Sequence, residues 1–168
     1  MMLFNFIDDP DAAHEWRVIN DTVMGGVSES TFEPTNTGAA FHGTVSLAHG
    51  GGFASVRAPT GAYDLSKAAG LQVHLRGDGK RYMWTLYTHP GGRISYRISF
   101  DAPTEWTMLT LPFDACEPYR RGRRVPGAPP FDASQVRTMG LLIGDKQDGS
   151  FRLDLQTIAA PALPASAV

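Results

Sequence analysis

One stretch decides the fold class of this chain: Arg93-Ile94-Ser95-Tyr96-Arg97-Ile98-Ser99-Phe100. Its apolar residues alternate strictly with arginines and serines, and a period of two sends alternate side chains to opposite faces of a β-strand. The same alternation recurs over residues 71–76 and 150–155. We therefore expect strands with one face buried in a core and the other face exposed.

Shorter apolar runs extend this pattern along the chain. They cover residues 40–47, 54–58, 82–88, 107–111 and 139–143. The 18 glycines and 12 prolines leave few windows for a long helix, so only one turn near 132–137, capped by Asp132, is expected. Short strands joined by such turns predict an all-β sandwich or jelly roll, with residues 1–158 as one domain and 159–168 as a flexible Ala/Pro tail.

Charge is balanced overall but not along the chain. The 168 residues carry a formal net charge of -2, which gives no general attraction to nucleic acid or to an anionic membrane. Residues 1–33 hold seven acidic residues and one arginine, whereas residues 76–124 hold nine basic residues and five acidic ones. Two interpretations stay open: ion pairs between these regions, or oriented arginine contacts with carboxylate or phosphate groups.

The ends and the cysteine content point to a compartment. The chain contains one cysteine, Cys116, so no internal disulfide can form. Its first residues lack both a basic segment and a long apolar run, so neither a signal peptide nor a membrane anchor is predicted. These features predict a cytoplasmic protein that does not insert into a membrane.

No catalytic arrangement is recognisable in the sequence. The five histidines are scattered, no Gly-x-Ser-x-Gly motif occurs, and Cys116 stands beside the carboxylate of Glu117, which should raise the pKa of the thiol. Glycine-rich stretches at 21–28 and 50–57 lack the Gly-Lys-Ser/Thr ending that binds nucleotide phosphates. We expect no enzymatic activity, no metal and no cofactor.

Arginine and aromatic residues come together in the central strands. In the strand predicted at 82–88, Tyr82 and Trp84 fall on one face and Tyr87 on the other. One face is expected to show aromatic rings beside the polar residues of other strands, which include His74, Arg76, Arg93 and Arg97. Arginine interleaved with aromatic residues is the composition of interface hot spots and of grooves for peptides or sugars.

Two motifs are specific enough to suggest a family. They are the segments 16–28 (Trp-Arg-Val-Ile-Asn-Asp-Thr-Val-Met-Gly-Gly-Val-Ser) and 51–57 (Gly-Gly-Phe-Ala-Ser-Val-Arg). Supporting segments lie at 41–47, 75–79, 111–113, 119–123 and 140–153. In this order, from about Phe6 to Ile158, the chain resembles the complex I intermediate-associated protein 30 family.

The resemblance implies a galactose-binding-like jelly roll and kinship with a mitochondrial factor that helps to assemble NADH:ubiquinone oxidoreductase without remaining in the finished enzyme. It also implies a surface made by the motif residues, to which the central strands add Trp84 and Arg97. The residues expected to bind are Asn20, Asp21, Met24, Gly25, Gly26, Ser28, Arg57, Arg76, Trp84, Arg97, Arg120, Arg121 and Arg123.

Three functions follow from these observations. The first is a non-catalytic binding module for a protein partner, an assembly or chaperone-like factor related to respiratory complex I assembly. The second is a domain that binds carbohydrate or another polar small molecule. The third is an enzyme on polar small molecules that uses Asp21, His74 or Arg57. Nucleic acid is not an expected partner, and a homodimer through edge strands is compatible with the pattern.

Overall fold

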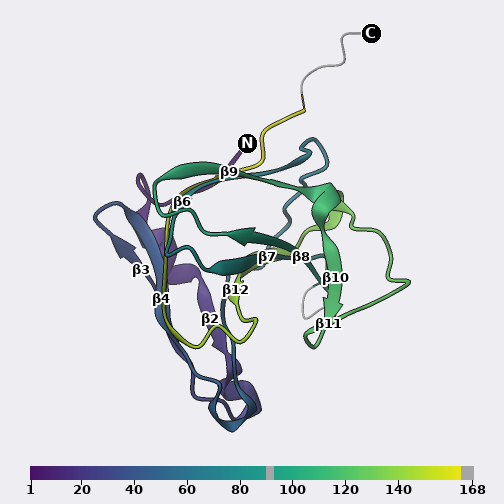
Figure 1. The fold of residues 1–168 in the computed structure, drawn as a ribbon. Coiled ribbons are helices and arrows are strands. Elements are labelled where there is room, and N and C mark those ends of the chain that lie inside the picture. The colour runs from purple at the N-terminus through teal and green to yellow at the C-terminus, as the bar shows by residue number, and fades with distance from the viewer. Residues whose placement is uncertain (90–92, 164–168) are drawn as a thin grey trace.

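Two antiparallel β-sheets pack face to face around one hydrophobic core (Figure 1). The computed structural model describes residues 1–89 and 93–163, without the side chains of Val23 and Met24. This architecture confirms the predicted all-β jelly-roll sandwich. Within the described residues, no helix has the length and apolar character needed to cross a membrane.

The first sheet follows the order β3-β4-β13-β6-β9, and β1 pairs with β13 outside this path. Its strands are β1 (Met2–Asn5), β3 (Glu29–Thr35), β4 (Gly38–Val45), β6 (Gly70–Arg76), β9 (Thr107–Pro112) and β13 (Gly149–Ala159). The long strand β13 lies between β4 and β6, so it holds the middle of this layer.

The second sheet follows the order β11-β10-β8-β7-β12-β5-β2. Its strands are β2 (Arg17–Asn20), β5 (Ala54–Arg57), β7 (Arg81–Tyr87), β8 (Ser95–Asp101), β10 (Glu117–Arg120), β11 (Arg123–Arg124) and β12 (Thr138–Ile143). In Figure 1 the β10–β11 hairpin stands beside β8 at one edge of this sheet.

Every strand predicted from the alternation is present, and the predicted turn at Asp132 is the short helix η5 (Ala133–Gln135), whose N-cap is Asp132. The missed strands are β1, β2, β3, β10 and β11. Three of these are the sheet edges β2, β3 and β11, where short length, charge and proline hide the alternation. Four further 3-10 helices also escaped prediction: η1 (Pro10–Glu15), η2 (Asp21–Met24), η3 (Ala48–Gly50) and η4 (Phe113–Ala115).

The segment that follows β13 packs against the sandwich as far as the structure describes it. Ala160 is buried, and its N–H donates to the carbonyl of Met1 at 2.8 Å. The N–H of Leu163 donates to the carbonyl of Lys67 at 2.7 Å. Residues 164–168 of the predicted tail lie outside the described part of the chain.

The indole of Trp84 lies at the centre of the core. Trp84 is fully buried on the inner face of β7, between the pairing strands β8 and β12. Its Nε1 is buried without a hydrogen-bond partner among the described residues. The side chain therefore stabilises the fold by packing alone, and its unpaired buried N–H reduces that stabilisation.

A buried carboxylate joins three loops at one end of the sandwich. Asp21, directly after β2, is fully buried. Its carboxylate accepts four hydrogen bonds: from the Ser28 hydroxyl (2.5 Å) and from the backbone N–H groups of Ser28 (3.0 Å), Gly52 (2.7 Å) and Phe53 (3.3 Å). We call this arrangement the Asp21 lock.

Two glycines make room for the Asp21 lock. A Cβ atom added at Gly26 would stand 2.6 Å from Oδ1 of Asp21, and one added at Gly51 would stand 2.5 Å from Oδ2. Gly25 closes η2 with a φ of 86°, in the left-handed region that favours glycine. The glycine-rich stretches at 21–28 and 50–57 therefore pack against each other around the carboxylate of Asp21.

The hydrogen bonds of the lock act on the pKa of Asp21. Burial alone raises this pKa, but the bonds from Ser28, Gly52 and Phe53 together outweigh burial, so the pKa lies below its ordinary value of 3.8. A carboxyl group whose pKa is lowered by folding stabilises the fold above its unfolded pKa. That stabilisation is lost as the pH falls through the folded pKa.

Replacement of Trp84 tests its place in the core. Trp84→Ala should lower the free energy of unfolding by about 3–5 kcal/mol, because it leaves a large cavity. Trp84→Phe should cost less, since it keeps an aromatic ring and removes the unpaired indole N–H. Urea unfolding measures both. A Trp84→Ala variant as stable as the wild type would contradict this placement.

Replacement of Asp21 tests the lock. Asp21→Ala should lower the free energy of unfolding by about 3 kcal/mol or more at neutral pH, because several buried donors lose their acceptor. The stability difference between wild type and Asp21→Asn should shrink as the pH falls from about 5 toward 2, since the carboxylate then becomes protonated in the wild type. Urea unfolding across this range gives the result. A difference that does not change with pH would show that the charge of Asp21 contributes nothing.

Candidate functional site

The outer face of the second sheet carries the side chains of the candidate site. The strand register sets Arg97 of β8 opposite Thr85 of β7, Thr85 opposite Gly140 of β12, and Gly140 opposite Arg57 of β5. Trp84, Leu86 and Ile98 point from the same strands into the core. The alternation in the sequence thus places two arginines on one outward row, with small residues between them.

Arg57 leans across β12 onto a tyrosine of β7. Its guanidinium carbon lies 4.2 Å from the centroid of the Tyr87 ring, and its Nη2 donates to the Tyr87 hydroxyl at 2.9 Å. The residue opposite Arg57 in the register is Gly140, which has no side chain to block this path. A Cβ atom there would also collide with the backbone carbonyl oxygen of Val56. Glycine at this position therefore serves both the strand pairing and the reach of Arg57.

Arg97 makes a second pair of the same kind. Its guanidinium carbon lies 4.8 Å from the centroid of the Tyr119 ring on β10. Its Nε donates to the Ser95 hydroxyl at 2.9 Å, and Nη1 lies 3.9 Å from the Met83 sulfur, a weak acceptor. We call Arg57, Tyr87, Arg97 and Tyr119 together the arginine–tyrosine face.

Both guanidinium groups are half-buried cations without an acidic partner. Among the described residues, no carboxylate oxygen lies within 4.0 Å of a guanidinium nitrogen of Arg57 or Arg97. Burial lowers the pKa of Arg97 below its ordinary value. The charge of Arg57 also lowers this pKa, whereas the nearby tyrosines and Asp145 raise it. An arginine nonetheless stays charged at neutral pH.

This face can bind but offers no reactive group. Arginine and tyrosine here present N–H and O–H donors to an acceptor, with their planes fixed by stacking. The only cysteine, Cys116, is half-buried, and burial followed by the charge of Asp114 raises its pKa to about 12. The thiol is therefore protonated at neutral pH. The residues that the structure describes contain no group of three His, Cys, Asp or Glu able to hold a metal ion.

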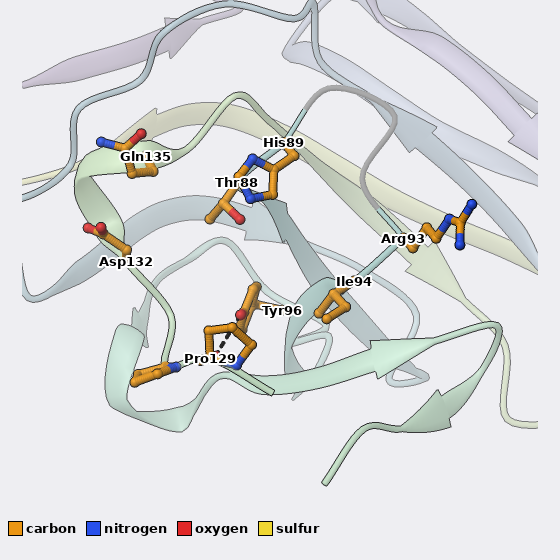
Figure 2. A pocket seen from close by; sticks show the side chains of 9 residues that line it. Thr88, His89, Arg93, Ile94, Tyr96, Pro129, Asp132 and Gln135 are labelled. Atoms are coloured by element: carbon orange, nitrogen blue, oxygen red, sulfur yellow. Dashed lines mark hydrogen bonds between the residues drawn. The ribbon is translucent and has the colours of Figure 1, made fainter. Parts of the chain in front are cut away.

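A surface hollow of about 460 Å³ lies just beyond the face, where β7 ends and β8 begins (Figure 2). Its lining residues are Thr88, His89, Arg93, Ile94, Tyr96, Pro129, Pro130, Asp132 and Gln135. Two of its polar groups already serve the fold: the Tyr96 hydroxyl donates to the carbonyl of Pro129 at 2.7 Å, and Asp132 caps η5. Figure 2 shows Arg93 extending away from the other lining residues. The hollow is thus a weaker candidate than the arginine–tyrosine face.

The motif residues expected to bind belong mostly to the Asp21 lock. Asp21, Gly26 and Ser28 are buried there. The side-chain oxygen of Asn20 accepts from the Ser30 hydroxyl at 2.7 Å. The side chain of Met24 lies outside the described atoms. These positions build the loops of the sandwich and present no shared surface, apart from the exposed Gly25.

Two further expectations need correction. Trp84 is fully buried in the core and cannot meet a ligand at the surface. Arg76 lies on the first sheet, where Nε stands 3.4 Å from Oδ2 of Asp154 and the guanidinium stacks on Trp106 at 4.9 Å. The expected face with His74, Arg76, Arg93 and Arg97 is therefore split, because the alternation separates inside from outside but does not assign a strand to a sheet.

The arginine loop is the tip of the β10–β11 hairpin. Arg121 and Gly122 both have positive φ, of 51° and 77°, as a two-residue hairpin turn of the primed type requires. Arg120 pairs with Arg123, one position away from the Tyr119–Arg124 pair, so it belongs to the opposite side of the hairpin from Tyr119. Arg120, Arg121 and Arg123 are exposed and lie off the arginine–tyrosine face.

The two tyrosines of the face are not among the residues expected from the sequence to bind. The period of two correctly sets Tyr87 on the face of β7 opposite Trp84, but Trp84 is the one of the two expected to bind. Tyr119 stands within the arginine-rich segment, where only the arginines are expected from the sequence to bind. The strand pairing of Tyr119 with Ser95 brings it beside Arg97. Within β7 the period of two sets Tyr87 on the same face as Thr85, but only the register between strands brings Arg97 and Arg57 into the row of Thr85.

Comparison with known proteins gives a consistent assignment. A family model described as complex I intermediate-associated protein 30 matches residues 4–155. An uncharacterised protein of Schizosaccharomyces pombe is 27% identical over 90% of this chain and 80% of its own length. The mitochondrial complex I intermediate-associated protein 30 of Mus musculus is 25% identical over 90% of this chain and 53% of its own length. The chain thus spans about half the length of the mouse relative.

Solved structures share the fold. The family 11 carbohydrate-binding module of the cellulosomal cellulase Lic26A-Cel5E of Clostridium thermocellum has a TM-score of 0.67 at 13% identity, covering 99% of this chain and 97% of the module. The family 11 module of the same organism in complex with a β-1,3-1,4-mixed-linked tetrasaccharide has a TM-score of 0.64 at 16% identity, covering 96% and 95%. These likenesses support the galactose-binding-like jelly roll, and they concern the fold alone.

The expected cytoplasmic location is wrong. The mouse relative is named as a mitochondrial protein, and this finding overturns the expectation. The lack of an internal disulfide indicates a reducing environment, but it does not identify which reducing compartment holds the protein. The motifs at 16–28 and 51–57 fall inside the region that the family model matches. The chain belongs to the complex I intermediate-associated protein 30 family.

Proposed function

We propose that this protein is a non-catalytic binding module, an assembly or chaperone-like factor that holds a protein partner on its arginine–tyrosine face. The observation that carries the proposal is the state of Arg57 and Arg97. Both are half-buried, stacked on tyrosines and without an acidic partner among the described residues. Arginine and tyrosine held in this way are typical of the residues that dominate protein interfaces.

The family supports a protein partner. The mouse relative is named for its association with complex I intermediates. We extend this role to the present chain as a proposal: its partner is a subunit or an assembly intermediate of a respiratory complex. Binding through a few pre-oriented side chains suits a factor that must later leave its partner, since affinity then depends on a small number of contacts.

The enzyme hypothesis loses support from the placement of its residues. Asp21 is buried in the lock, His74 lies on β6 of the first sheet, and Arg57 lies on β5 of the second sheet. A catalytic group must reach the same substrate as its partners, within hydrogen-bond distance. These three side chains share no site.

Capture of the partner tests the proposal. The tagged wild type should retain respiratory-complex proteins from an extract of respiring cells, and an Arg57→Ala/Arg97→Ala variant should lose about nine-tenths or more of them, as expected when central interface residues are truncated. The matched control is Arg120→Ala/Arg123→Ala, which removes the same charge from the exposed hairpin side off the face. All three proteins should unfold at closely similar urea concentrations.

Two outcomes would contradict the proposal. Equal loss of partners in the face variant and the control would show diffuse charge attraction instead of a site. Full retention by the face variant would place the partner elsewhere on the surface.

Carbohydrate binding is the second candidate, because the fold is that of carbohydrate-binding modules. Such binding uses open aromatic ring faces together with polar groups in a concave site. Here the guanidinium of Arg57 covers one face of the Tyr87 ring, and Tyr87 is only 8% exposed. This arrangement leaves little of that ring for a sugar.

Calorimetry separates the two candidates. We expect no heat of binding when the β-1,3-1,4-mixed-linked tetrasaccharide is titrated to about millimolar concentration, because the ring of Tyr87 is not available. A dissociation constant below about 1 mM that is lost in Tyr119→Ala would instead establish carbohydrate binding at this face.

A further inference from the structure

We infer that the segment docking on the arginine–tyrosine face is an extended acidic peptide, whose carboxylates bind the guanidinium groups of Arg57 and Arg97. This inference rests on the proposed function and specifies the chemistry of the partner. Its starting point is the unused hydrogen-bonding capacity of the two arginines. Each guanidinium carries several N–H donors in a planar fork that matches a carboxylate.

Most of these donors have no acceptor within the described residues. Arg57 donates once, to the neutral hydroxyl of Tyr87. Arg97 donates to the neutral hydroxyl of Ser95 and to the Met83 sulfur. A half-buried charge that lacks a counter-ion is stabilised most by a carboxylate that brings both opposite charge and paired acceptors.

The surroundings make the face electropositive. Arg17, on the edge strand β2, stands opposite Arg57 in the register. Arg124, on β11, stands opposite Tyr119. Glu117 stands opposite Arg97 in the register of β8 and β10, but its carboxylate lies 3.7 Å from Nε of Arg124 and not within 4.0 Å of the Arg97 guanidinium. Asp145 acts on Arg97 only from beyond 4.0 Å. Within the described chain, the face is therefore left with an excess of positive charge.

The chain does not supply the missing carboxylates from its own acidic region. The contacts within 4.0 Å between acidic and basic side chains of the described residues are Glu33–His42, Arg76–Asp154, Arg81–Asp101, Arg124–Glu117 and Arg152–Asp154. None of them joins the acids of residues 1–33 to the bases of residues 76–124. The expectation of internal pairing between those regions thus fails, and the alternative of oriented contacts to outside groups gains support.

The stacking geometry favours an acid over a neutral sugar. The guanidinium groups occupy the ring faces of Tyr87 and Tyr119, where a sugar ring would pack. Stacking leaves the edges of a guanidinium, which carry the N–H donors, available to a planar acceptor. The face therefore offers hydrogen-bond donors in fixed planes more than it offers apolar platforms.

The spacing of the strands sets the form of the peptide. Arg97 and Arg57 lie three strands apart, which corresponds to about 14 Å between their Cα atoms. Arg57 leans toward β7, so its guanidinium stands closer to Arg97 than its Cα does. In an extended chain, alternate residues point to the same side at about 3.4 Å per residue. Acidic residues at positions i and i+2 or i+4 therefore fit the two arginines.

A labelled peptide with glutamates at alternate positions is the direct probe, measured by fluorescence anisotropy. The wild type should bind it at least about tenfold more tightly than its glutamine counterpart, and Arg57→Ala/Arg97→Ala should weaken binding by about tenfold or more, because charge-assisted bonds are lost. The control Arg120→Ala/Arg123→Ala should bind like the wild type. Arg57→Lys/Arg97→Lys should weaken binding severalfold, since charge remains but the paired donors are lost. Equal binding of both peptides overturns the inference.

A peptide library without compositional bias separates this inference from the proposed function. Selection of acidic peptides that the double alanine variant no longer binds supports both. Selection of neutral peptides that still depend on Arg57 and Arg97 keeps the binding module and overturns the acidic partner. Selection of no peptide, together with failed capture of proteins, overturns both.

Two further measurements test other occupants of the face, an acidic oligosaccharide and a second copy of the chain. An acidic oligosaccharide such as trigalacturonate that binds the wild type in place of every peptide would overturn the peptide. Self-association in analytical ultracentrifugation that the double alanine variant abolishes would identify a second copy of the chain as the occupant and would equally overturn it.

Discussion

The buried carboxylate of Asp21 is the constraint on which the two-sheet arrangement depends at one end. Asp21 follows β2 of the second sheet, and its partner Ser28 precedes β3 of the first sheet. The N–H groups of Gly52 and Phe53, which also bond to Asp21, lead into β5. Ser28 in turn accepts from the N–H of Ser46, directly after β4, at 2.9 Å. One ionised group thus ties together the ends of four strands from both layers. A charge can be buried here because enough donors surround it to outweigh the loss of water.

Two donors of the Asp21 lock, Gly52 and Phe53, lie in the same family motif as the proposed binding residue Arg57, residues 51–57. Phe53 bonds to Asp21 and leads into β5, and β5 ends at Arg57, so the lock and Arg57 lie at the two ends of one short strand. The segments that carry the resemblance to the family are dominated by residues that serve the loops. The residues of the proposed arginine–tyrosine face are fewer, and they stand on strands β5, β7, β8 and β10. A motif that identifies a family can therefore describe how the domain is built and leave its partner open.

The sequence predicted the fold class well, because alternation is a direct result of strand geometry. It predicted eight strands, the outward direction of Arg97 and the placement of Tyr87 on the face of its strand opposite Trp84, since these follow from a period of two. It could not assign Arg76 to the first sheet and Arg97 to the second, because that depends on which strands pair across long distances in the chain. The same limit hid the contact between Tyr119 and Arg97, which exists only because β10 pairs with β8. The expectation that Trp84 binds a partner was wrong, because aromatic residues are common both in cores and in binding sites and the residue type does not distinguish the two. Its even position beside Tyr82 and Leu86 is what separates the two.

The two arginines of the arginine–tyrosine face are electrostatically unfavourable in the free protein, and the same charges serve the proposed binding of an acidic partner. Holding Arg97 half-buried beside Arg57 without a counter-ion is unfavourable, as the lowered pKa of Arg97 indicates. Stacking on the tyrosines and the hydrogen bonds to neutral hydroxyls offset part of this cost, and they also fix the planes of the guanidinium groups before any partner arrives. A partner that brings carboxylates then loses less side-chain entropy on binding than it would against free arginines, and it relieves the repulsion between the two charges. The electrostatic cost of two neighbouring arginines without counter-ions and the proposed affinity for an acidic partner therefore have the same origin, and the fixed guanidinium planes add a requirement for orientation to the requirement for charge.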